Sequence, residues 1–385
     1  MIPYATFSFV ELIFYPVCLT LLLGGLRRDG RWWKIAVTLA LTAIFASLRK
    51  TDAGREVWML TAYGVWQYAV LRLYQSAGAP RGLTFYSALA ASLSPLVATR
   101  IWPVASSHSE IGFLGLSYVT FRALDVVFCL RDKVLKEIST ADLLCYLFFF
   151  PTLSAGPIDR YRRFVVDLHH QRTRAEFRRD LDGAVQHFFR GCLYKFIIAA
   201  LIDHYWLARC DKGAAFSSVV SYMYGYSFFL FFDFAGYSAF AIALSYLFGV
   251  HTPENFNRPF LAQNIRDFWN RWHMTLSFWF RDHIYMRFIL AARKGNWLRG
   301  RNVTATAGFF LTFGFMGLWH GLRWQYILYG LYHATLLSGF YIYSEKTKRP
   351  VSYAPGMLRR AVSIAITFHC VCFGFLIFSG RLTAS

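Results

Sequence analysis

Apolar runs that could cross a lipid bilayer recur from one end of the sequence to the other. They lie near residues 2–25, 33–48, 57–75, 83–99, 111–130, 142–156, 187–208, 217–250, 303–320, 325–344 and 361–379. A transmembrane helix needs about 20 mostly apolar residues. Only 16% of the residues are charged, against roughly 25% in a typical soluble domain. The pattern predicts an all-α, multi-pass membrane protein that forms one integral-membrane domain over residues 1–385.

The charges beside the first run predict the orientation of the chain. The run from Ile2 to Gly25 has no basic residue before it and is followed by "RRDGRWWK". Lys and Arg stay on the cytoplasmic side of a membrane, and a signal peptide has the opposite charge order. We therefore expect an uncleaved first helix with its N-terminus outside. Alternation then places 131–141 and 251–302 in the cytoplasm and His320 toward the outer end of its helix.

The run "LLCYLFFFPTLSAGP" does not fit this alternation as a spanning helix. If residues 142–156 crossed the membrane, the arginine-rich segment 157–190 would lie outside, against the positive-inside bias. The run is also short, and Pro151 and Gly156 interrupt its end. Apolar runs of about 10–14 residues dip into a bilayer more often than they span it. We predict a re-entrant segment whose two flanks are both cytoplasmic.

The formal net charge is +20, and most of it is carried by the hydrophilic segments between the apolar runs. Basic loops set topology and meet anionic lipid headgroups, which explains most of the charge without a nucleic acid as partner. A second interpretation is that the cytoplasmic face binds an acidic protein. Seven cysteines lie mostly inside apolar runs, without a C-x-x-C pair or zinc spacing, and predict reduced thiols and no metal site. P-loop, G-x-S-x-G and H-E-x-x-H motifs are missing from the sequence.

Ionisable residues inside apolar runs are costly and mark functional candidates. These candidates are Glu11, Arg122, Asp125, Arg190, Lys195, Asp203, His204, Asp233, His320, His333 and His369. For most of them, ion pairs between or within helices are the alternative explanation, such as Arg122 with Asp125 at i,i+3.

His320 is the exception among these residues. It lies in "FGFMGLWHGLRW", with no acidic residue within ten positions on either side. Burial disfavours the charged imidazolium form, and a neutral imidazole is a competent general base. Gly317 and Gly321 nearby would let a backbone or a substrate approach closely. A histidine that only hydrogen-bonds a neighbouring helix remains the other interpretation.

The stretch "RDFWNRWHMTLSFWFRD", residues 266–282, combines aromatic residues with charges. On one continuous helix, Asn270, His273, Ser277 and Arg281 would form a single polar stripe on an otherwise apolar surface. Such a helix suits the membrane interface or a buried, water-lined path. A purely anchoring, tryptophan-rich interfacial helix is the alternative.

Several blocks carry a resemblance to a known family. They are "IGFLGLSYVTFRALDVV", "FFFPTLSAGPIDRYRRF", the segment 228–288 and "GFMGLWHGL", in this order, over roughly 111–378. Together they resemble the membrane-bound O-acyltransferase family. Within it, "DFWNRWHMTLSFWFRDHIYMRF" and the tail "CVCFGFLIFSG" are most similar to the D-alanyl-transferring branch (the Dlt system). The acetyltransferase branch of the alginate type usually continues differently where this chain has "YMRFIL".

The resemblance implies a fold and a reaction. The fold would be a ring of about ten to twelve transmembrane helices around a central funnel, with N-terminal helices in 1–110, a family core in 111–378, a re-entrant segment 142–156 and interfacial helices in 251–302. The protein would take D-alanine from a 4′-phosphopantetheine thioester on a small acidic carrier protein. It would pass it to a hydroxyl outside the bacterial cytoplasmic membrane, on teichoic acid or another cell-envelope glycan. Further membrane subunits of the transfer system would be partners.

The same resemblance assigns roles to single residues. The family's near-invariant histidine falls on His320, and its second signature position falls on His273. A neutral His320 could take the proton of the acceptor hydroxyl, while Asn270 and His273 could stabilise the oxyanion. Arg281 and Lys195 could attract the phosphate of the donor arm. Ser277, Asp233 and Trp319 complete the predicted substrate-binding set.

The donor is already activated as a thioester, so we expect no tightly bound cofactor and no metal. An O-acetyltransferase of the alginate type is the closest alternative function. A transporter or channel would use the same intramembrane charges, but such proteins often show paired helix breaks in two halves, and we find no such pairing here. A non-catalytic scaffold of a wall-polymer complex is the remaining alternative.

Overall fold

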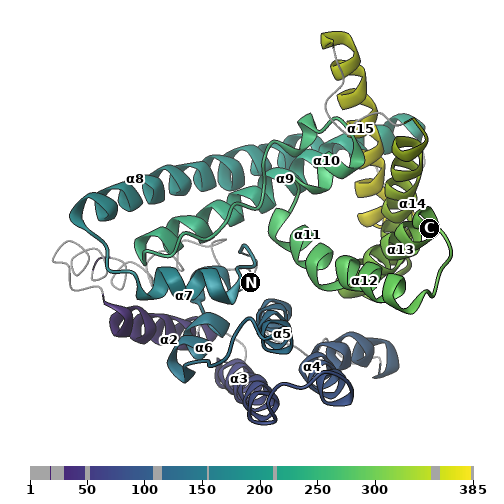
Figure 1. Ribbon diagram of the computed structural model, residues 1–385. Coiled ribbons are helices and arrows are strands. Elements are labelled where there is room, and N and C mark those ends of the chain that lie inside the picture. Colours follow the sequence, from purple (N-terminus) through teal and green to yellow (C-terminus); the bar gives the residue numbers. More distant parts are fainter. Residues whose placement is uncertain are drawn as a thin grey trace. The chain divides into compact units, whose positions relative to one another are not determined.

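A computed structural model describes residues 18, 30–47, 53–106, 115–153, 156–210, 215–347 and 356–382. Within these ranges every regular element is a helix (Figure 1). The predicted all-α membrane fold is therefore confirmed. The first predicted span, 2–25, and the candidate Glu11 lie outside the described residues, apart from Cys18.

The contacts of the chain define two compact units. Unit 1 comprises Met1–Gly191 with Tyr237–Pro253, and unit 2 comprises Cys192–Gly236 with Glu254–Ser385. Each unit is described by itself below. The predicted single domain, its division at residue 110 and its arrangement around a central funnel stay predictions.

The helices coincide with the apolar runs of the sequence. Among the described residues, three helical segments are long and apolar enough to cross a membrane, namely Arg174–Arg209, Phe216–Leu247 and Met357–Phe378. The runs near 33–48, 57–75, 83–99 and 111–130 form α2 (Arg31–Ser47), α3 (Ala53–Ser76), α4 (Leu83–Ser106) and α5 (Leu116–Arg131). Those near 303–320 and 325–344 form α13 (Arg301–His320) and α14 (Trp324–Thr347).

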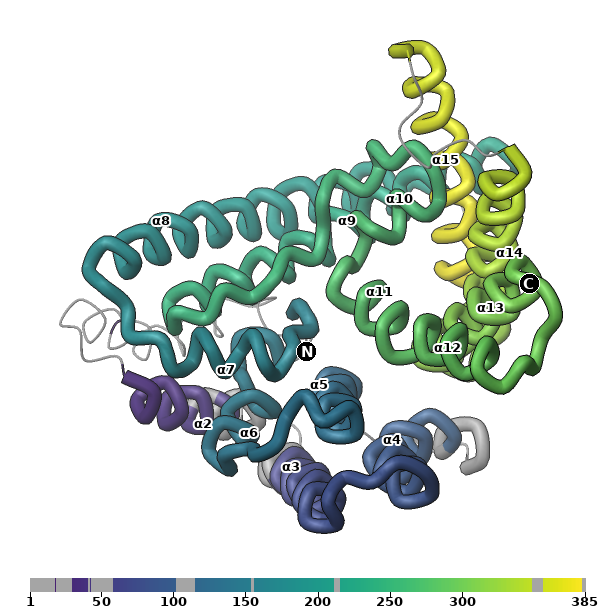
Figure 2. The backbone as a smooth tube through the Cα atoms, in the orientation of Figure 1, coloured from purple at the N-terminus to yellow at the C-terminus, as the bar shows by residue number. Residues whose placement is uncertain are grey.

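Unit 1 is built on α2 to α5, with α3, α4 and α5 packed against one another (Figure 2). Against them lie α6 (Thr140–Leu147), the short helix η1 (Phe150–Thr152) and α7 (Tyr161–His169). The unit also contains α8 (Arg174–Gly191) and the end of α9 (Phe216–Leu247). The predicted re-entrant run therefore forms a short helix, a break and one 3-10 turn, while its position in a membrane stays a prediction.

Arg122 explains how this broken segment is tolerated in an apolar environment. The last carbonyls of a helix have no partner within the helix. The Nη1 atom of Arg122 donates to the carbonyls of Tyr146 and Leu147, each at 3.0 Å, and Nη2 donates to the carbonyl of Thr152 at 2.9 Å. Arg122 is only 1% exposed. The guanidinium thus satisfies the backbone where α6 ends.

Arg122 and Asp125, the example given above for an ion pair within a helix, bind different partners. Asp125 instead accepts from Nη1 of Arg160 at 2.9 Å and from the backbone N–H of Tyr161 at 3.0 Å. Tyr161 is the first residue of α7, so the carboxylate satisfies a free N–H at a helix start, where negative charge is favoured. Arg122 therefore binds the C-terminal end of α6, and Asp125 binds the N-terminal end of α7.

A second polar cluster joins α7, α8 and the loop after α9. The Nε2 atom of His251 lies 2.8 Å from Oδ1 of Asp180, and the His251 backbone N–H donates to Asp167 at 2.8 Å. Arg172 donates to the carbonyls of Tyr246 and Leu247, each at 3.1 Å. The bonds of Arg172 satisfy the last carbonyls of α9 with a charged group.

Unit 2 begins with π-helical and 3-10 turns, η2 (Cys192–Ala199), η3 (Ile202–Trp206) and η4 (Leu207–Arg209), and contains the first part of α9. It continues with η5 (Pro259–Leu261), α10 (Ile265–Trp269), α11 (Met274–Phe280), η6 (Arg281–Tyr285), α12 (Met286–Gly295), α13, α14 and α15 (Met357–Phe378).

The helices α13 and α14 form a tight pair (Figure 1). A Cβ on Gly317 would lie 2.5 Å from the carbonyl oxygen of Tyr326, and one on Gly330 would lie 2.4 Å from that of Phe313. Glycine is therefore required at both positions.

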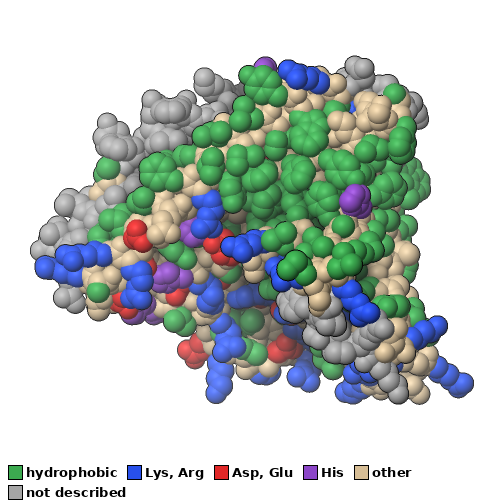
Figure 3. Space-filling model, turned by 90° about the horizontal axis from the view of Figure 1, so that it is seen from above, with side chains coloured by type: hydrophobic (Ala, Val, Ile, Leu, Met, Phe, Trp, Pro, Cys, Tyr) green, Lys and Arg blue, Asp and Glu red, His purple; other side chains and the backbone are tan. Residues whose placement is uncertain are grey.

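Hydrophobic side chains make up much of the face seen in Figure 3, and charged side chains gather in other parts of it. Such an area is expected of a surface that meets lipid rather than water. All seven cysteines are free; Cys145 and Cys372 are buried, and Cys18 is exposed. That they are reduced thiols stays a prediction.

Candidate functional site

The eight residues predicted to form the site all belong to unit 2. They are Lys195, Asp233, Asn270, His273, Ser277, Arg281, Trp319 and His320. They come from four parts of the unit: the π-helical turn η2, helix α9, the segment α10–η6 and the end of α13.

His320 is the last residue of α13 and is half-buried among aromatic rings. Its ring centroid lies 4.5 Å from that of Trp319 and 4.9 Å from that of Phe378. Tyr326 follows at 5.8 Å and Tyr329 at 6.4 Å. This enclosure places an imidazole at a helix end within an apolar wall, which is the environment expected of a neutral general base.

His273 does not lie on a continuous helical stripe, and this part of the prediction is wrong. Helix α10 ends at Trp269 and α11 begins at Met274. His273 lies between them with φ 41°, in the left-handed region. Two backbone hydrogen bonds that a continuous helix would not allow hold the turn. The N–H of Met274 donates to the carbonyl of Asn255, and the N–H of Asn257 donates to the carbonyl of Arg271, both at 2.9 Å. The break turns His273 away from the line of its neighbours.

The imidazole of His273 is 5% exposed, and its ring meets the ring of Phe234 edge-on with centroids 4.7 Å apart. Its Nε2 atom has no hydrogen-bond partner among the described residues. Burial, together with a smaller effect of the nearby His320, lowers the pKa of His273 to about 3. His273 is therefore neutral at physiological pH and lies within electrostatic range of His320.

Asn270, Ser277 and Arg281 do share one surface, because they line a pocket of about 320 Å³ between α10, α11, η6, α13 and α14. The described residues that line it include two arginines, Arg266 and Arg281, and none that is acidic. Aromatic rings form much of the wall, including Trp269 and Phe313. His273, Lys195 and Asp233 are not among its lining residues. The pocket suits a partly apolar ligand that carries a negative charge.

Arg266 is the member of this pocket that sequence reasoning missed. Its guanidinium lies 5.6 Å from the ring centroid of Phe340 and 5.9 Å from that of Tyr341. It precedes Asn270 by one helical turn, so the i,i+4 spacing on α10 was the available signal. The predicted stripe began one turn too late.

Lys195 and Asp233 are joined to each other. Lys195 Nζ lies 2.5 Å from Asp233 Oδ1, and the two side chains are 10% and 35% exposed. Lys195 projects from the π-helical turn η2, where one extra residue per turn changes the direction of side chains. Both residues were predicted to bind substrate, and their pairing leaves each with a structural partner.

His333 lies beneath the pocket wall, against Trp269 with ring centroids 5.1 Å apart. It is fully buried, and neither ring nitrogen has a hydrogen-bond partner among the described residues. A Cβ on Gly374 would lie 2.6 Å from its Nε2 atom, so glycine makes room for the imidazole. Groups of three or more His, Cys, Asp or Glu that could hold a metal ion do not occur in the described part of the chain.

Comparison with known proteins gives a consistent result. Residues 70–379 match the sequence model of the membrane-bound O-acyltransferase family. The chain is 41% identical to a teichoic acid D-alanyltransferase of Bacillus subtilis, over 99% of this chain and 98% of the relative. It is 36% identical to the protein of that name from Lacticaseibacillus rhamnosus, over 91% and 90%. A probable alginate O-acetylase of Pseudomonas aeruginosa is 32% identical over 69% of this chain and 48% of the relative. The chain is an acyltransferase and belongs to the membrane-bound O-acyltransferase family.

Proposed function

We propose that this protein transfers D-alanine from a thioester donor to teichoic acid at the bacterial cytoplasmic membrane. The observation that carries the proposal is the position of His320 at the end of α13, enclosed by aromatic rings and within electrostatic range of a neutral His273. The relatives with near-complete coverage are named teichoic acid D-alanyltransferases, whereas the acetylase relative is matched over a smaller part of both chains.

In this mechanism His320 is the general base. Its neutral imidazole takes the proton of the acceptor hydroxyl while the hydroxyl oxygen attacks the thioester carbonyl. The carbon–sulfur bond then breaks, and the imidazolium returns the proton to the departing thiolate. The oxyanion formed in between requires a preorganised donor. The buried Nε2 of His273, which has no partner among the described residues, is the group we assign to this role.

The donor arm is assigned to the pocket beside α11. A 4′-phosphopantetheine arm has a phosphate at one end and amide groups along an apolar chain. Arg266 supplies positive charge for the phosphate, whereas Arg281 is paired with Asp282 at 2.9 Å and would have to exchange this partner for the phosphate. Asn270 and Ser277 supply polar groups for the amides. Lys195 and Asp233 support the helices rather than bind this arm, and Trp319 forms part of the wall around His320.

The donor protein and the topology complete the proposal. An acidic carrier protein would bind the cytoplasmic face, where exposed arginines occur at Arg162, Arg174, Arg178 and Arg179. Other membrane subunits of the transfer system would be further partners. We place the chain in the membrane as a multi-pass protein with 142–156 re-entrant.

Single cysteines at positions 135 and 170 in a cysteine-free background should both resist an impermeant thiol reagent in intact cells. Labelling of one alone would contradict the re-entrant segment.

The decisive experiment compares two donors. The purified full-length protein is placed in liposomes and supplied with carrier protein loaded with radiolabelled D-alanine or radiolabelled acetate, and label in the acceptor is counted. We expect D-alanine to be transferred and acetate to be transferred poorly, with the His320→Ala variant as the blank for each donor. Preferential transfer of acetate would move the protein to the acetylase branch of the family. Transfer by neither donor would contradict the thioester mechanism.

A further inference from the structure

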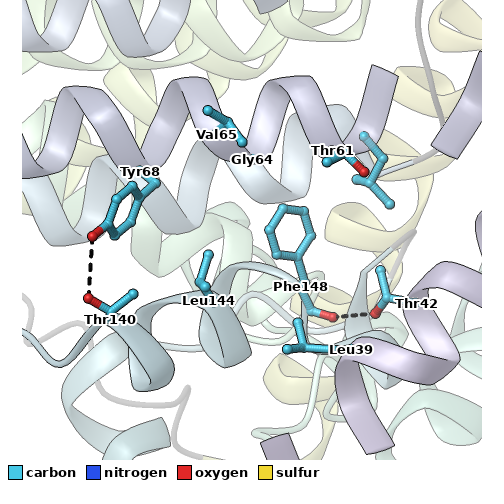
Figure 4. A pocket seen from close by; sticks show the side chains of 10 residues that line it. Leu39, Thr42, Thr61, Gly64, Val65, Tyr68, Thr140, Leu144 and Phe148 are labelled. Carbon is cyan, nitrogen blue, oxygen red and sulfur yellow. Dashed lines mark hydrogen bonds between the residues drawn. The ribbon is translucent and has the colours of Figure 1, made fainter. Parts of the chain in front are cut away.

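Unit 1 contains a pocket that the proposed reaction does not use. It measures about 400 Å³ and lies between α2, α3 and α6. Its walls are mostly apolar side chains with a few hydroxyl groups (Figure 4). The lining residues are Leu39, Thr42, Leu60, Thr61, Gly64, Val65, Tyr68, Thr140, Leu144 and Phe148.

The hydroxyl groups in this wall are largely occupied by one another or by the backbone. Thr42 Oγ1 donates to the carbonyl of Phe148 at 2.7 Å, and the hydroxyls of Tyr68 and Thr140 lie 3.3 Å apart (Figure 4). Val65 is 62% exposed although it is apolar. A hydrocarbon chain is the ligand that such a wall favours, because apolar contact is the main interaction that it offers.

Phe148 forms the floor of the pocket and ties it to the broken segment after α6. A Cβ on Gly64 would lie only 2.0 Å from the ring of Phe148. Glycine at position 64 therefore lets the ring lie directly on the backbone of α3. A ligand that fills the pocket would cover both Phe148 and Leu144.

One end of the pocket carries a positive charge. Arg72 lies one turn beyond Tyr68 on α3, and its guanidinium carbon is 5.3 Å from the centroid of the Tyr68 ring. Its hydrogen-bond partners are neutral, namely Thr140 Oγ1 at 2.6 Å and Gln75 Oε1 at 2.9 Å. Among the described residues no carboxylate lies within ion-pair distance of Arg72, whereas the neighbouring Arg31 is paired with Asp142 at 2.7 Å.

We propose that this pocket binds an anionic phospholipid of the surrounding bilayer, with one acyl chain against Val65, Leu144 and Phe148 and the phosphate on Arg72. The apolar shaft and the cation at its end match the two parts of such a lipid. The N-terminus of α6, capped by Ser139, adjoins the same end and adds partial positive charge. The topology expected from the sequence places this end at the cytoplasmic surface, where anionic headgroups attract basic residues.

The test uses the purified full-length protein and two defined lipids, phosphatidylglycerol and phosphatidylcholine. Native mass spectrometry counts the lipid retained by each variant. We expect the wild type to retain phosphatidylglycerol roughly fivefold better, as one basic residue near a membrane surface provides. Arg72→Gln should remove this preference, and Val65→Trp should reduce retention of both lipids by filling the pocket.

Matched controls separate the pocket from general lipid binding. Leu73 is 71% exposed on the same helix but does not line the pocket, so Leu73→Trp should retain lipid like the wild type. Arg81→Gln, in an exposed turn outside the pocket, should keep the preference. Equal retention by Val65→Trp and Leu73→Trp, or an unchanged preference in Arg72→Gln, would overturn the proposal.

A second measurement uses only the wild-type protein, so its result does not depend on whether a variant folds. Phosphatidylglycerol with a photoactivatable group in its acyl chain is bound to the wild-type protein and irradiated. The crosslinked peptides are then identified. We expect label on residues 60–68 of α3 and on residues 144–148 at the end of α6. Label confined to other helices would contradict the site.

Discussion

Lys195 Nζ and Asp233 Oδ1 lie 2.5 Å apart and join the π-helical turn η2 to helix α9. The sequence assigned both residues to substrate, but the structure pairs them. Loss of one partner would leave the other charge uncompensated in an apolar helix, whereas loss of both leaves no charge to solvate.

We predict that Lys195→Met and Asp233→Asn each destabilise the protein by about 2 kcal/mol, a value reduced from that of a fully buried pair because Asp233 is partly exposed. The double variant should recover most of this loss and should retain transfer activity. Thermal unfolding and D-alanyl transfer are measured for all four proteins. A stable but inactive double variant would return these residues to the substrate site.

His320→Ala should abolish transfer while the protein remains folded. General-base catalysis contributes about 10²–10⁴-fold in rate. Loss of a structural hydrogen bond would instead appear as a lowered melting temperature. The control is His369→Ala, because His369 Nδ1 bonds to the carbonyl of Ala365 in its own helix, at 2.6 Å. A folded His320→Ala protein with a rate within a few-fold of the wild type would remove this residue from the mechanism.

His273→Ala should reduce the rate of transfer more than Trp279→Phe does at equal protein level. His273 offers a buried nitrogen without a partner among the described residues, whereas Trp279 is 3% exposed and packs beside His283 with ring centroids 4.8 Å apart. The tryptophan change should appear mainly in stability. If Trp279→Phe proves the more damaging to rate, the segment is an anchor and His273 has no role in the reaction.

Stability should fall in alkaline solution because of His251. The side-chain hydrogen bonds to Asp167 and Asp180 raise the pKa of His251 from 6.5 to about 9. Burial opposes ionisation of Asp167, but its bonds with His251 and the charge of Arg163 outweigh this and lower its pKa. A histidine whose pKa is raised by folding stabilises the fold fully at a pH below its pKa in the unfolded protein. This stabilisation is lost as the pH rises through its pKa in the folded protein.

The expected loss between pH 6.5 and pH 9.5 is about 1 kcal/mol, since the His251 side chain is 48% exposed and solvent screens the pair. Denaturation at a series of pH values measures it, and His251→Gln should flatten the curve in this window relative to the wild type. An identical slope in the two proteins would show that other groups cause the pH dependence.

Binding of the acidic carrier should weaken as salt rises, because exposed charges are screened over about 8 Å at physiological ionic strength. Charge reversal at the exposed Arg178 and Arg179 should weaken binding further and reduce the salt dependence. Surface plasmon resonance with the protein in nanodiscs measures both effects, with Arg81→Glu as the control. Binding that does not respond to salt would indicate an apolar docking surface.

The sequence alone determined where the helices lie and which family the chain belongs to. Hydropathy is a local property, and an apolar run in lipid must satisfy its backbone bonds within itself. The long apolar runs among the described residues are therefore helical. His320 could also be identified from local sequence, because no acidic residue lies within ten positions of it. The break after Leu147 also followed from local chemistry, namely Pro151 within a short run.

Only the tertiary structure decided which polar groups meet. Arg122 and Asp125 are neighbours on one helix, yet each binds the end of a different helix. His273 left its expected stripe because the turn before α11 bonds to residues 255 and 257, and Lys195 found Asp233 across 38 positions of sequence. Buried charges and free helix ends are satisfied by whatever partner the packing brings within hydrogen-bond distance. That distance depends on the path of the whole chain, so a periodic pattern within one segment cannot specify it.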